Sequence, residues 1–382
     1  MTLQRTPLYA AHERLGARLV EFGGWEMPVQ YTSIMDEHQA VRTAGGLFDI
    51  SHMGEVWVTG AEAANFLNAT LTNNVAKLVP GQAQYSLLCN ERGGVVDDLY
   101  LYCVGKETFL LIINASRIEA DMEWLRARHA VFAKRDAVLM SNVSAEYGAV
   151  AVQGPRVAEF IDQMFPATGT IKAARPTQLL KNEVDLFNFG GRDAFVARTG
   201  YTGEDGFEIV TSAENIEAVW NRLLEVGQPF GLKPAGLGAR DTLRTEACLP
   251  LYGHELDETT TPIEAGLGFF VALDKGDFTG RSVLAEQKTN GVSRKCVAFK
   301  MTEKSAPPRP HYPIWSAGPD AKKIGEAASG TQSPSLNIGI GLGYVPTEFA
   351  QPETPIEIEI RGRRSPAVIV RKPIYKRKPE QT

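Results

Sequence analysis

Strand-like and helical patterns alternate irregularly along the first 275 residues, and this order limits the fold more than any other feature. A doubly wound parallel sheet needs strands and helices to follow each other regularly, which they do not do here. Amphipathic helices are predicted at 61–69 and 115–128, around strands in "QYSLLC", "VVDDLYLY" and "TFLLIIN". Pro155 is expected to open another helix. We therefore predict the α+β class.

The composition changes near residue 275. Beyond this point, segments rich in Pro, Gly and Ser separate short strand candidates. The stretch "TPIEIEIRGRRSPAVIV" is typical of a β-hairpin, because isoleucines alternate with charged residues before a glycine-bearing turn. We predict a mixed α+β region at 1–275 and a separate β-barrel domain at 276–382.

The chain of 382 residues carries a net charge of −5, which gives no reason to expect a nucleic acid or an anionic membrane as partner. No apolar run approaches the roughly 18 residues of a membrane-spanning helix, and the N-terminus lacks the pattern of a signal peptide. The four cysteines are scattered without a C-x-x-C pair. They indicate free thiols in a reducing compartment, so we expect a cytoplasmic protein.

Common signatures of cofactor and metal enzymes are missing. No G-x-G-x-x-G follows a predicted strand, and there is no P-loop, H-E-x-x-H or G-x-S-x-G. The six histidines show no spacing typical of metal ligands. We therefore expect no metal and no redox cofactor, and any chemistry must depend on Asp, Glu and Arg.

Two adjacent aspartates lie inside a predicted strand, in "VVDDLYLY". Aspartate is depleted in strand interiors because it packs poorly on a half-buried pleated surface. Successive strand residues point to opposite faces, so Asp97 and Asp98 must face opposite sides of the sheet. Asp98 shares its face with Tyr100 and Tyr102, which suits the wall of a site for a flat heterocycle. We predict that Asp98 works in catalysis and that Asp97 supports it.

A second candidate is Glu204, in the glycine-rich segment "ARTGYTGEDGFEIV". Gly200, Gly203 and Gly206 recur every three residues, which gives the backbone freedom for a tight loop between strands. The spacing alone favours a plain connection with Glu204 solvated at its tip. In the alternative, Glu204 binds a ligand with paired donors, because a carboxylate can accept two parallel hydrogen bonds.

A third candidate is Arg240, in the first turn of a helix predicted to begin just after Gly238. A cation at this position opposes the helix macrodipole, so a surface arginine gains nothing there. Two interpretations remain open. Arg240 forms an ion pair with Asp241 or Glu246, or it binds a ligand.

A basic tail, 361–378, holds eight Lys or Arg and no acidic residue. Charge runs of this kind are usually solvated. In a net-acidic chain, the tail could also meet an acidic partner or a ligand with several carboxylates.

Together these motifs resemble the glycine cleavage T-protein family of tetrahydrofolate-dependent aminomethyltransferases. The matching segments are "FDISHMGE", "GGVVDDL", "RTGYTGEDGFEI", "GLGARDTLRTEACLPLYGHEL", "TPIEAGLGF" and "SGTQSPSL". The resemblance implies three lobes around a central folate-binding hole: two intertwined lobes in the region 1–275, and the β-barrel as the third. It also implies the transfer of a methylene group from an aminomethylated lipoyl arm, carried by the H-protein, to tetrahydrofolate, with release of ammonia.

The resemblance further implies roles for individual residues. The family's folate-contacting aspartate corresponds to Asp98, which is the expected catalytic residue. Its pterin-contacting glutamate and folate-contacting arginine fall on Glu204 and Arg240. Tyr85 and Asn114 match other positions of the pocket.

Two other functions remain as alternatives. One is folate-dependent demethylation of a different small methyl donor, since relatives share the folate pocket. The other is a non-enzymatic folate-binding role in iron–sulfur cluster maintenance, whose typical K-G-C-Y/F signature is absent.

Overall fold

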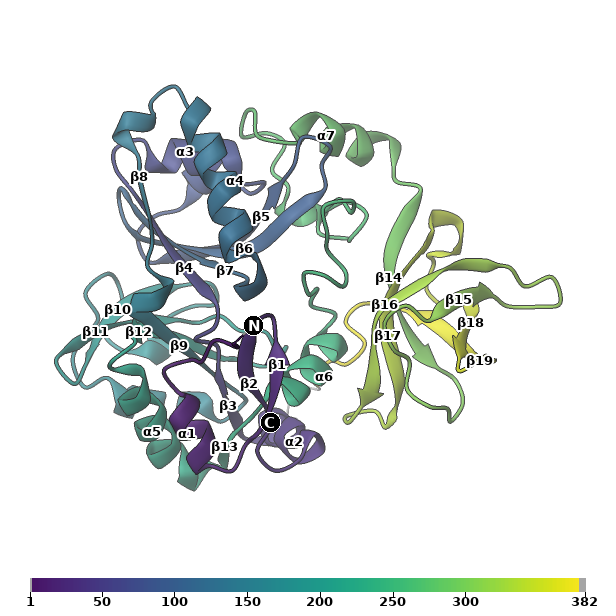
Figure 1. Ribbon diagram of the computed structural model, residues 1–382, viewed down its shortest axis with the longest axis horizontal. Helices are drawn as coiled ribbons and strands as arrows, with labels where there is room; N and C mark the ends of the chain where they lie inside the picture. Colours follow the sequence, from purple (N-terminus) through teal and green to yellow (C-terminus); the bar gives the residue numbers. More distant parts are fainter. Residues whose placement is uncertain (1, 378–382) are drawn as a thin grey trace.

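The computed structural model describes residues 2–377, which form three lobes (Figure 1). Two lobes are built on sheets covered by helices, and the third is a closed barrel at the right of the view. The predicted α+β class with a C-terminal β-barrel is confirmed.

The first lobe contains a six-stranded sheet and a short hairpin. In sheet order the strands are β10 (Val184–Phe189), β11 (Arg192–Ala197), β12 (Gly206–Ser212), β9 (Tyr147–Gln153), β3 (Gly45–Asp49) and β13 (Leu232–Pro234). The hairpin pairs β1 (Arg18–Phe22) with β2 (Trp25–Gln30). The central strand β9 is buried on both faces, because Val150 and Val152 pack in one core and Ala149 and Ala151 in another.

Helices cover both faces of this sheet. On one face lie α1 (Tyr9–Arg14) and α5 (Ile216–Gly227), and on the other lie α2 (Ile34–Thr43) and α6 (Leu237–Ala247). The face with α2 and α6 also meets the second sheet, since Leu110 and Ile112 of that sheet share its core. The boundary between the two sheets is therefore a packed interface.

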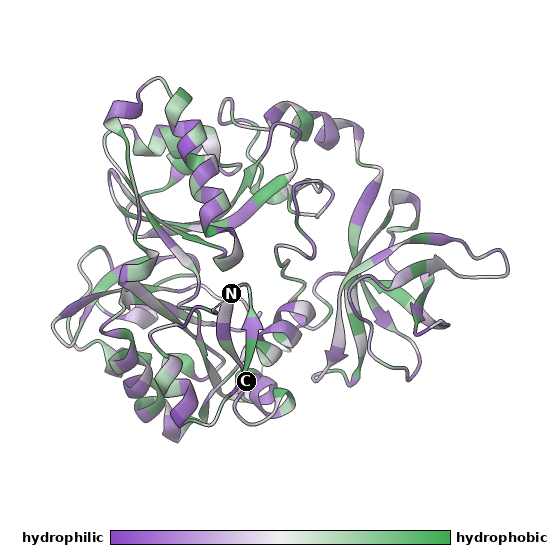
Figure 2. Ribbon diagram, viewed as in Figure 1, coloured by the Kyte–Doolittle hydropathy of each residue, from purple (hydrophilic) through white to green (hydrophobic). Residues whose placement is uncertain are grey.

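The second lobe holds a five-stranded sheet, which contains the aspartate pair. In order its strands are β5 (Gln82–Cys89), β6 (Val95–Gly105), β7 (Thr108–Ile113), β4 (Gly54–Thr59) and β8 (Leu139–Asn142). Helices α3 (Ala63–Thr70) and α4 (Ile118–Val131) pack against its outer face. Figure 2 shows hydrophilic and hydrophobic residues on both α4 and α5, as expected of helices that bury one face.

The third lobe is a six-stranded antiparallel barrel. In order its strands are β14 (Arg294–Met301), β17 (Ile338–Pro346), β16 (Lys323–Ser333), β15 (Pro313–Ser316), β18 (Pro355–Ile360) and β19 (Arg363–Val370). The alternating isoleucines of β18 point into the barrel core, and Arg361 and Gly362 at the turn to β19 have positive φ. This is the hairpin that the sequence predicted.

The segment after Pro155 differs from the structure predicted for it. Pro155 does not open an α-helix: two short 3₁₀ segments follow, Val157–Glu159 and Ile161–Met164, and their apolar side chains are buried in the core of the first lobe.

The domain start at residue 276 stays a prediction. Between it and β14 lies α7 (Arg281–Asn290), whose Leu284 packs in one core with residues of β5 and β6. Among the described residues, no helix is long and apolar enough to cross a membrane.

Candidate active site

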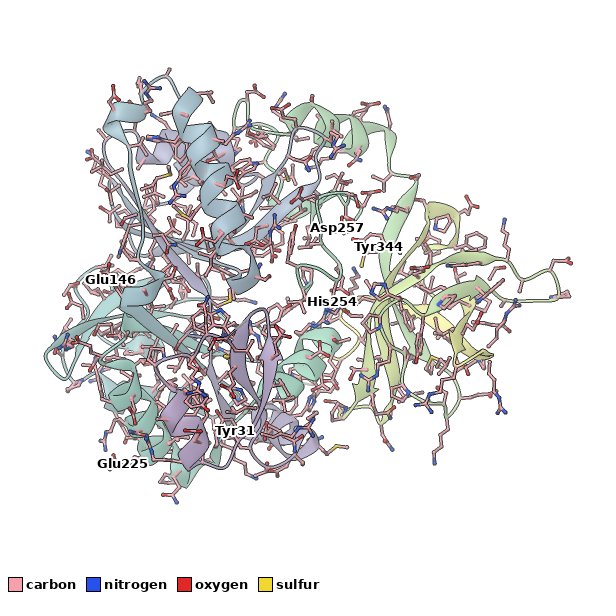
Figure 3. The ribbon with its side chains drawn as sticks, viewed as in Figure 1. Tyr31, Glu146, Glu225, His254, Asp257 and Tyr344 are labelled. Atoms are coloured by element: carbon pink, nitrogen blue, oxygen red, sulfur yellow. The ribbon has the colours of Figure 1, made fainter. Side chains whose placement is uncertain are left out.

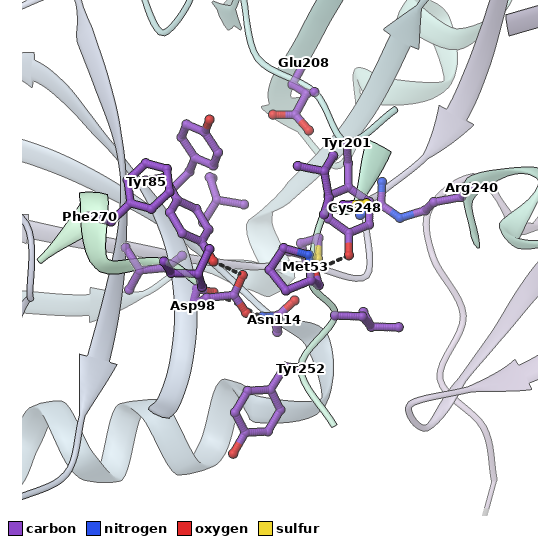
Figure 4. Close-up of a pocket in the computed structure, with 18 residues that line it drawn as sticks. Met53, Tyr85, Asp98, Asn114, Tyr201, Glu208, Arg240, Cys248, Tyr252 and Phe270 are labelled. Atoms are coloured by element: carbon purple, nitrogen blue, oxygen red, sulfur yellow. Dashed lines mark hydrogen bonds between the residues drawn. The ribbon is translucent and has the colours of Figure 1, made fainter. Parts of the chain in front are cut away.

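A cavity opens where the two sheets, α6 and the segment 248–270 meet (Figure 4). Its walls are mostly apolar, and a few polar side chains converge on it, which is the usual make-up of a small-molecule site. Figure 3 labels His254 and Tyr344 near the junction with the barrel. His254 Nδ1 lies 3.0 Å from the Ala328 carbonyl oxygen, and Tyr344 donates to the Glu255 carbonyl at 2.6 Å. The barrel thus supports one wall of the cavity.

Asp98 lines this cavity on the second lobe, as the strand alternation predicted. Tyr85 Oη donates a hydrogen bond to Asp98 Oδ2 at 2.9 Å, and Asn114 Nδ2 donates to Oδ1 at 3.0 Å. Burial, together with the nearby charge of Asp97, raises the pKa of Asp98 to about 7. A carboxyl group with this pKa can both accept and release a proton near neutral pH.

Asp97 points away from the cavity, toward α4. Its side chain is fully buried, and it accepts hydrogen bonds from the backbone N–H of Asn114 at 3.1 Å and from Asn114 Nδ2 at 2.8 Å. Asn114 follows directly after β7, so the end of that strand places one amide between the two aspartates. The two aspartates therefore lie on opposite sides of the strand, and their division into a catalytic and a supporting residue stays a prediction.

Aromatic rings form the rest of this wall. The ring of Tyr85 packs edge-on against Phe270, with centroids 4.7 Å apart, and against Tyr100, with centroids 5.9 Å apart. All three side chains line the cavity. The predicted pocket residues Tyr85 and Asn114 are thus brought together with Asp98, beside a surface suited to a flat ring.

Glu204 does not line the cavity, so the structure does not bring this residue, which was predicted from the sequence, together with Asp98. Gly203 has a φ of +82°, and the loop turns Glu204 toward α2. There Arg42 Nη1 lies 2.8 Å from Glu204 Oε1, and the Glu204 side chain is only 4% exposed. It also lies 3.6 Å from Nη1 of Arg377. Glu204 is therefore neither solvated nor free for a ligand.

Glu208 lies at the position where we expected Glu204, four residues further along the chain. It is on β12 and lines the cavity, opposite Asp98 in Figure 4. Its carboxylate accepts a hydrogen bond from Thr199 Oγ1 and a long one, 3.4 Å, from Tyr102 Oη. The sequence did carry a signal for it: Phe207 and the residue after Glu208 are apolar, so Glu208 must face the other side of its strand.

Arg240 also lines the cavity, from the first turn of α6. Its guanidinium lies over the ring of Tyr201, with Cζ 4.5 Å from the ring centroid. Burial lowers the pKa of Arg240 below its ordinary value.

The ion pairs considered for Arg240 do not form among the described residues. Asp241 binds Arg244 at 2.7 Å, and Glu246 binds Arg42 at 2.8 Å. The helical spacing explains this result, because Asp241 and Arg244 lie three residues apart on one face. Of the two interpretations, the one that leaves Arg240 facing a ligand agrees with the geometry.

The basic tail does not form one surface. Arg364, on the barrel, lies over the ring of Trp315, with its Cζ 3.7 Å from the ring centroid. Arg377 instead contacts Glu204 in the first lobe. Lys378 lies outside the described residues. Arg364 and Arg377 thus have different neighbours, and a role of the tail in binding an acidic partner or ligand stays a prediction.

No group of three or more His, Cys, Asp or Glu side chains between residues 2 and 377 has the geometry of a metal site. The polar side chains of the cavity include one carboxylate on each side, one guanidinium, several tyrosine hydroxyl groups and one amide. This set suits an organic ligand with several hydrogen-bonding edges.

Comparison with known proteins identifies the family. A family model described as "GCVT N-terminal domain" matches residues 8–275, and one described as "Glycine cleavage T-protein C-terminal barrel domain" matches residues 294–376. The chain belongs to the glycine cleavage T-protein family. An aminomethyltransferase of Bacillus mycoides (strain KBAB4) is 50% identical over 384 residues, and one of Bacillus cereus (strain AH187) is 49% identical, each match covering 99% of both chains.

A solved T-protein family structure is also similar to the whole chain. The crystal structure of glycine cleavage system aminomethyltransferase T from Bartonella henselae matches with a TM-score of 0.88 and 33% identity, over 98% of both chains. The predicted family, fold class and enzymatic function are confirmed: the chain is an aminomethyltransferase of the glycine cleavage system. Membership of the T-protein family implies a tetrahydrofolate substrate and an interaction with the H-protein of that system.

Proposed function

We propose that the cavity binds tetrahydrofolate and that the enzyme transfers to it the methylene group of an aminomethylated lipoyl arm carried by the H-protein. The products are methylenetetrahydrofolate, ammonia and the dihydrolipoyl H-protein. The observation that carries this proposal is the position of Asp98, a partly buried carboxyl group with a pKa near neutral, held between Tyr85 and Asn114 in an aromatic cavity.

The reaction requires proton movement that Asp98 is suited to support. The two folate nitrogens that capture the methylene lose protons, and the leaving sulfur and amine end protonated. An ionised Asp98 beside these nitrogens orients the folate, stabilises the positive charge of an iminium-like intermediate, and relays a proton. Tyr85 and Asn114 donate hydrogen bonds to this carboxylate, so its orientation does not depend on the substrate.

We propose that Glu208 and Arg240, rather than Glu204, bind the folate from the other side of the cavity. Glu208→Gln and Arg240→Ala are each expected to weaken folate binding by about 1–3 kcal/mol, the range for a lost charged hydrogen-bond partner. Glu204→Gln serves as the control, because Glu204 lies outside the cavity. Calorimetric titration with tetrahydrofolate measures all three. Normal affinity in both cavity variants, with weak binding by Glu204→Gln, would contradict this assignment.

The activity is expected to need no metal ion. The reaction moves protons and one carbon unit, and the groups proposed to handle them are side chains of the protein. Turnover after exhaustive dialysis against a chelator should equal that of the untreated enzyme. Loss of turnover that one particular metal restores would refute this expectation.

We also propose a cytoplasmic location. All four cysteines are free thiols in the structure, and three of them are buried. Free thiols persist in a reducing compartment.

A further inference from the structure

A third buried carboxyl group lies behind the two aspartates of β6. Asp121, on α4, is fully buried, and neither of its oxygens accepts a hydrogen bond from a donor group of the described residues. Its carboxyl group lies within hydrogen-bonding reach of that of Asp97. Two carboxylates this close, away from water, cannot both stay ionised, so one proton is held between them.

Asn114 connects this pair to the cavity. Its side-chain amide donates to Asp97 at 2.8 Å and to Asp98 at 3.0 Å. Polar groups therefore form a continuous line from α4 to the cavity, in the order Asp121, Asp97, Asn114, Asp98 and Tyr85. A change at Asp121 can therefore reach Asp98 through Asp97 and Asn114.

We propose that Asp121 is a positioning residue that shares one proton with Asp97 and so keeps a single negative charge behind Asp98. This inference rests on the proposed role of Asp98 in moving protons. The hydrogen bond from Asp121 stabilises the ionised form of Asp97. The charge on Asp97 then makes Asp98 a stronger base than burial alone would make it.

The surrounding charges agree with a protonated Asp121. Burial and the charge of Asp97 both raise the pKa of Asp121, and Arg117, which lowers it, does not offset them. Arg117 also binds Glu258 at 2.9 Å, so its charge is shared. The other titratable groups that face the three aspartates are Tyr85, Tyr201 and Tyr252.

Two variants test the role of Asp121 in turnover. In Asp121→Ala, Asp97 loses a donor and becomes protonated, so the pKa of Asp98 falls. The acid limb of the kcat/KM profile should then move to lower pH by about one unit, with kcat reduced about tenfold. Asp121→Asn keeps a donor to Asp97 and leaves the single charge there, so it should restore both values. Wild-type profiles in both folded variants would reduce Asp121 to a packing role.

A second measurement is independent of activity. The infrared spectrum of the wild-type protein at pH 8 should contain the carbonyl stretch of a protonated carboxyl group, which Asp121→Asn removes. Glu55→Gln is the matched control, because Glu55 is also fully buried without a partner, and burial raises its pKa. It should remove a different component of the band. If Asp121→Asn removes none, the proton is not held there and the proposal is wrong. If the band behaves as expected but the wild-type enzyme shows no aminomethyl transfer, the proposed function fails instead.

Discussion

Asp98→Asn is expected to lower kcat by about 10²–10⁴, the range for loss of a general acid–base group, with a much smaller effect on folate affinity. The substitution keeps the shape of the side chain but removes its charge and its basicity. Tyr85 and Asn114 still lie within hydrogen-bonding distance of this position, so the variant should remain folded. Steady-state kinetics and folate titration on the same preparation separate the two effects.

The value of kcat/KM should also change with pH in a defined direction. The ionised form of Asp98 is the active form, and its pKa is about 7. The wild-type kcat/KM should therefore fall as the pH drops below about 7 and level off above it. Asp98→Asn should lose this limb. Asp97→Asn, the neighbouring control, should mainly reduce stability. Retained turnover in Asp98→Asn, with loss in Asp97→Asn, would reverse the two roles.

Arg42→Met is expected to lower the free energy of unfolding by about 3–5 kcal/mol, the range for removing one partner of a buried ion pair. The Arg42 side chain is 4% exposed. Its guanidinium nitrogens lie 2.8 Å from a carboxylate oxygen of Glu204 and 2.8 Å from one of Glu246, and both carboxylates are buried. Without the guanidinium, both carboxylates lose a charged partner while they remain buried. Urea unfolding compares the variant with the wild type.

The matched control uses the same helix. Asp36 on α2 pairs with Lys233 at 2.8 Å, but both side chains are more than 40% exposed. Lys233→Met should leave the unfolding midpoint nearly unchanged, because exposed pairs contribute little. Arg42, Glu204 and Glu246 together form what we call the Arg42 cluster. If Arg42→Met unfolds like Lys233→Met while its affinity for folate falls strongly, the Arg42 cluster is part of the ligand site.

The Arg42 cluster also has a pH signature. Burial raises the pKa of Glu246, but hydrogen bonds from His38 and Ser333 and the charge of Arg42 outweigh this effect and hold the pKa at about 2. A depressed pKa means that ionised Glu246 stabilises the fold above its unfolded value of roughly 4.3, and that this contribution is lost as the pH falls toward 2. Arg42→Met should raise the pH at which acid unfolding begins.

The periodicity of strand residues predicted that the Asp98 side chain faces the cavity and the Asp97 side chain does not. Alternation along β6 is enough to separate Asp97 from Asp98, because the side-chain period of a strand is fixed by its geometry. The hairpin of β18 and β19 was predictable for the same reason. Around Pro155 the local signal failed: the segment forms two 3₁₀ turns, whose apolar side chains are buried in the core of the first lobe.

Long-range contacts decided what the sequence did not predict. Glu204 and Glu208 occur in one motif, and Arg42, 162 residues away from Glu204, binds Glu204 outside the cavity. The basic tail divides for a similar reason, because Arg377 meets Glu204 across a large sequence separation. Asp121 was also unpredicted, since its partner Asp97 lies on another element. Period and composition contain no information about such pairs.

The most direct test of the account is a single-turnover assay with purified enzyme, aminomethyl-loaded H-protein and tetrahydrofolate. We expect stoichiometric release of ammonia that depends on folate, with formation of methylenetetrahydrofolate, and loss of both products in Asp98→Asn. Absence of folate-dependent ammonia release, together with turnover of a small methylated donor by the same preparation, would contradict the proposed reaction and favour folate-dependent demethylation.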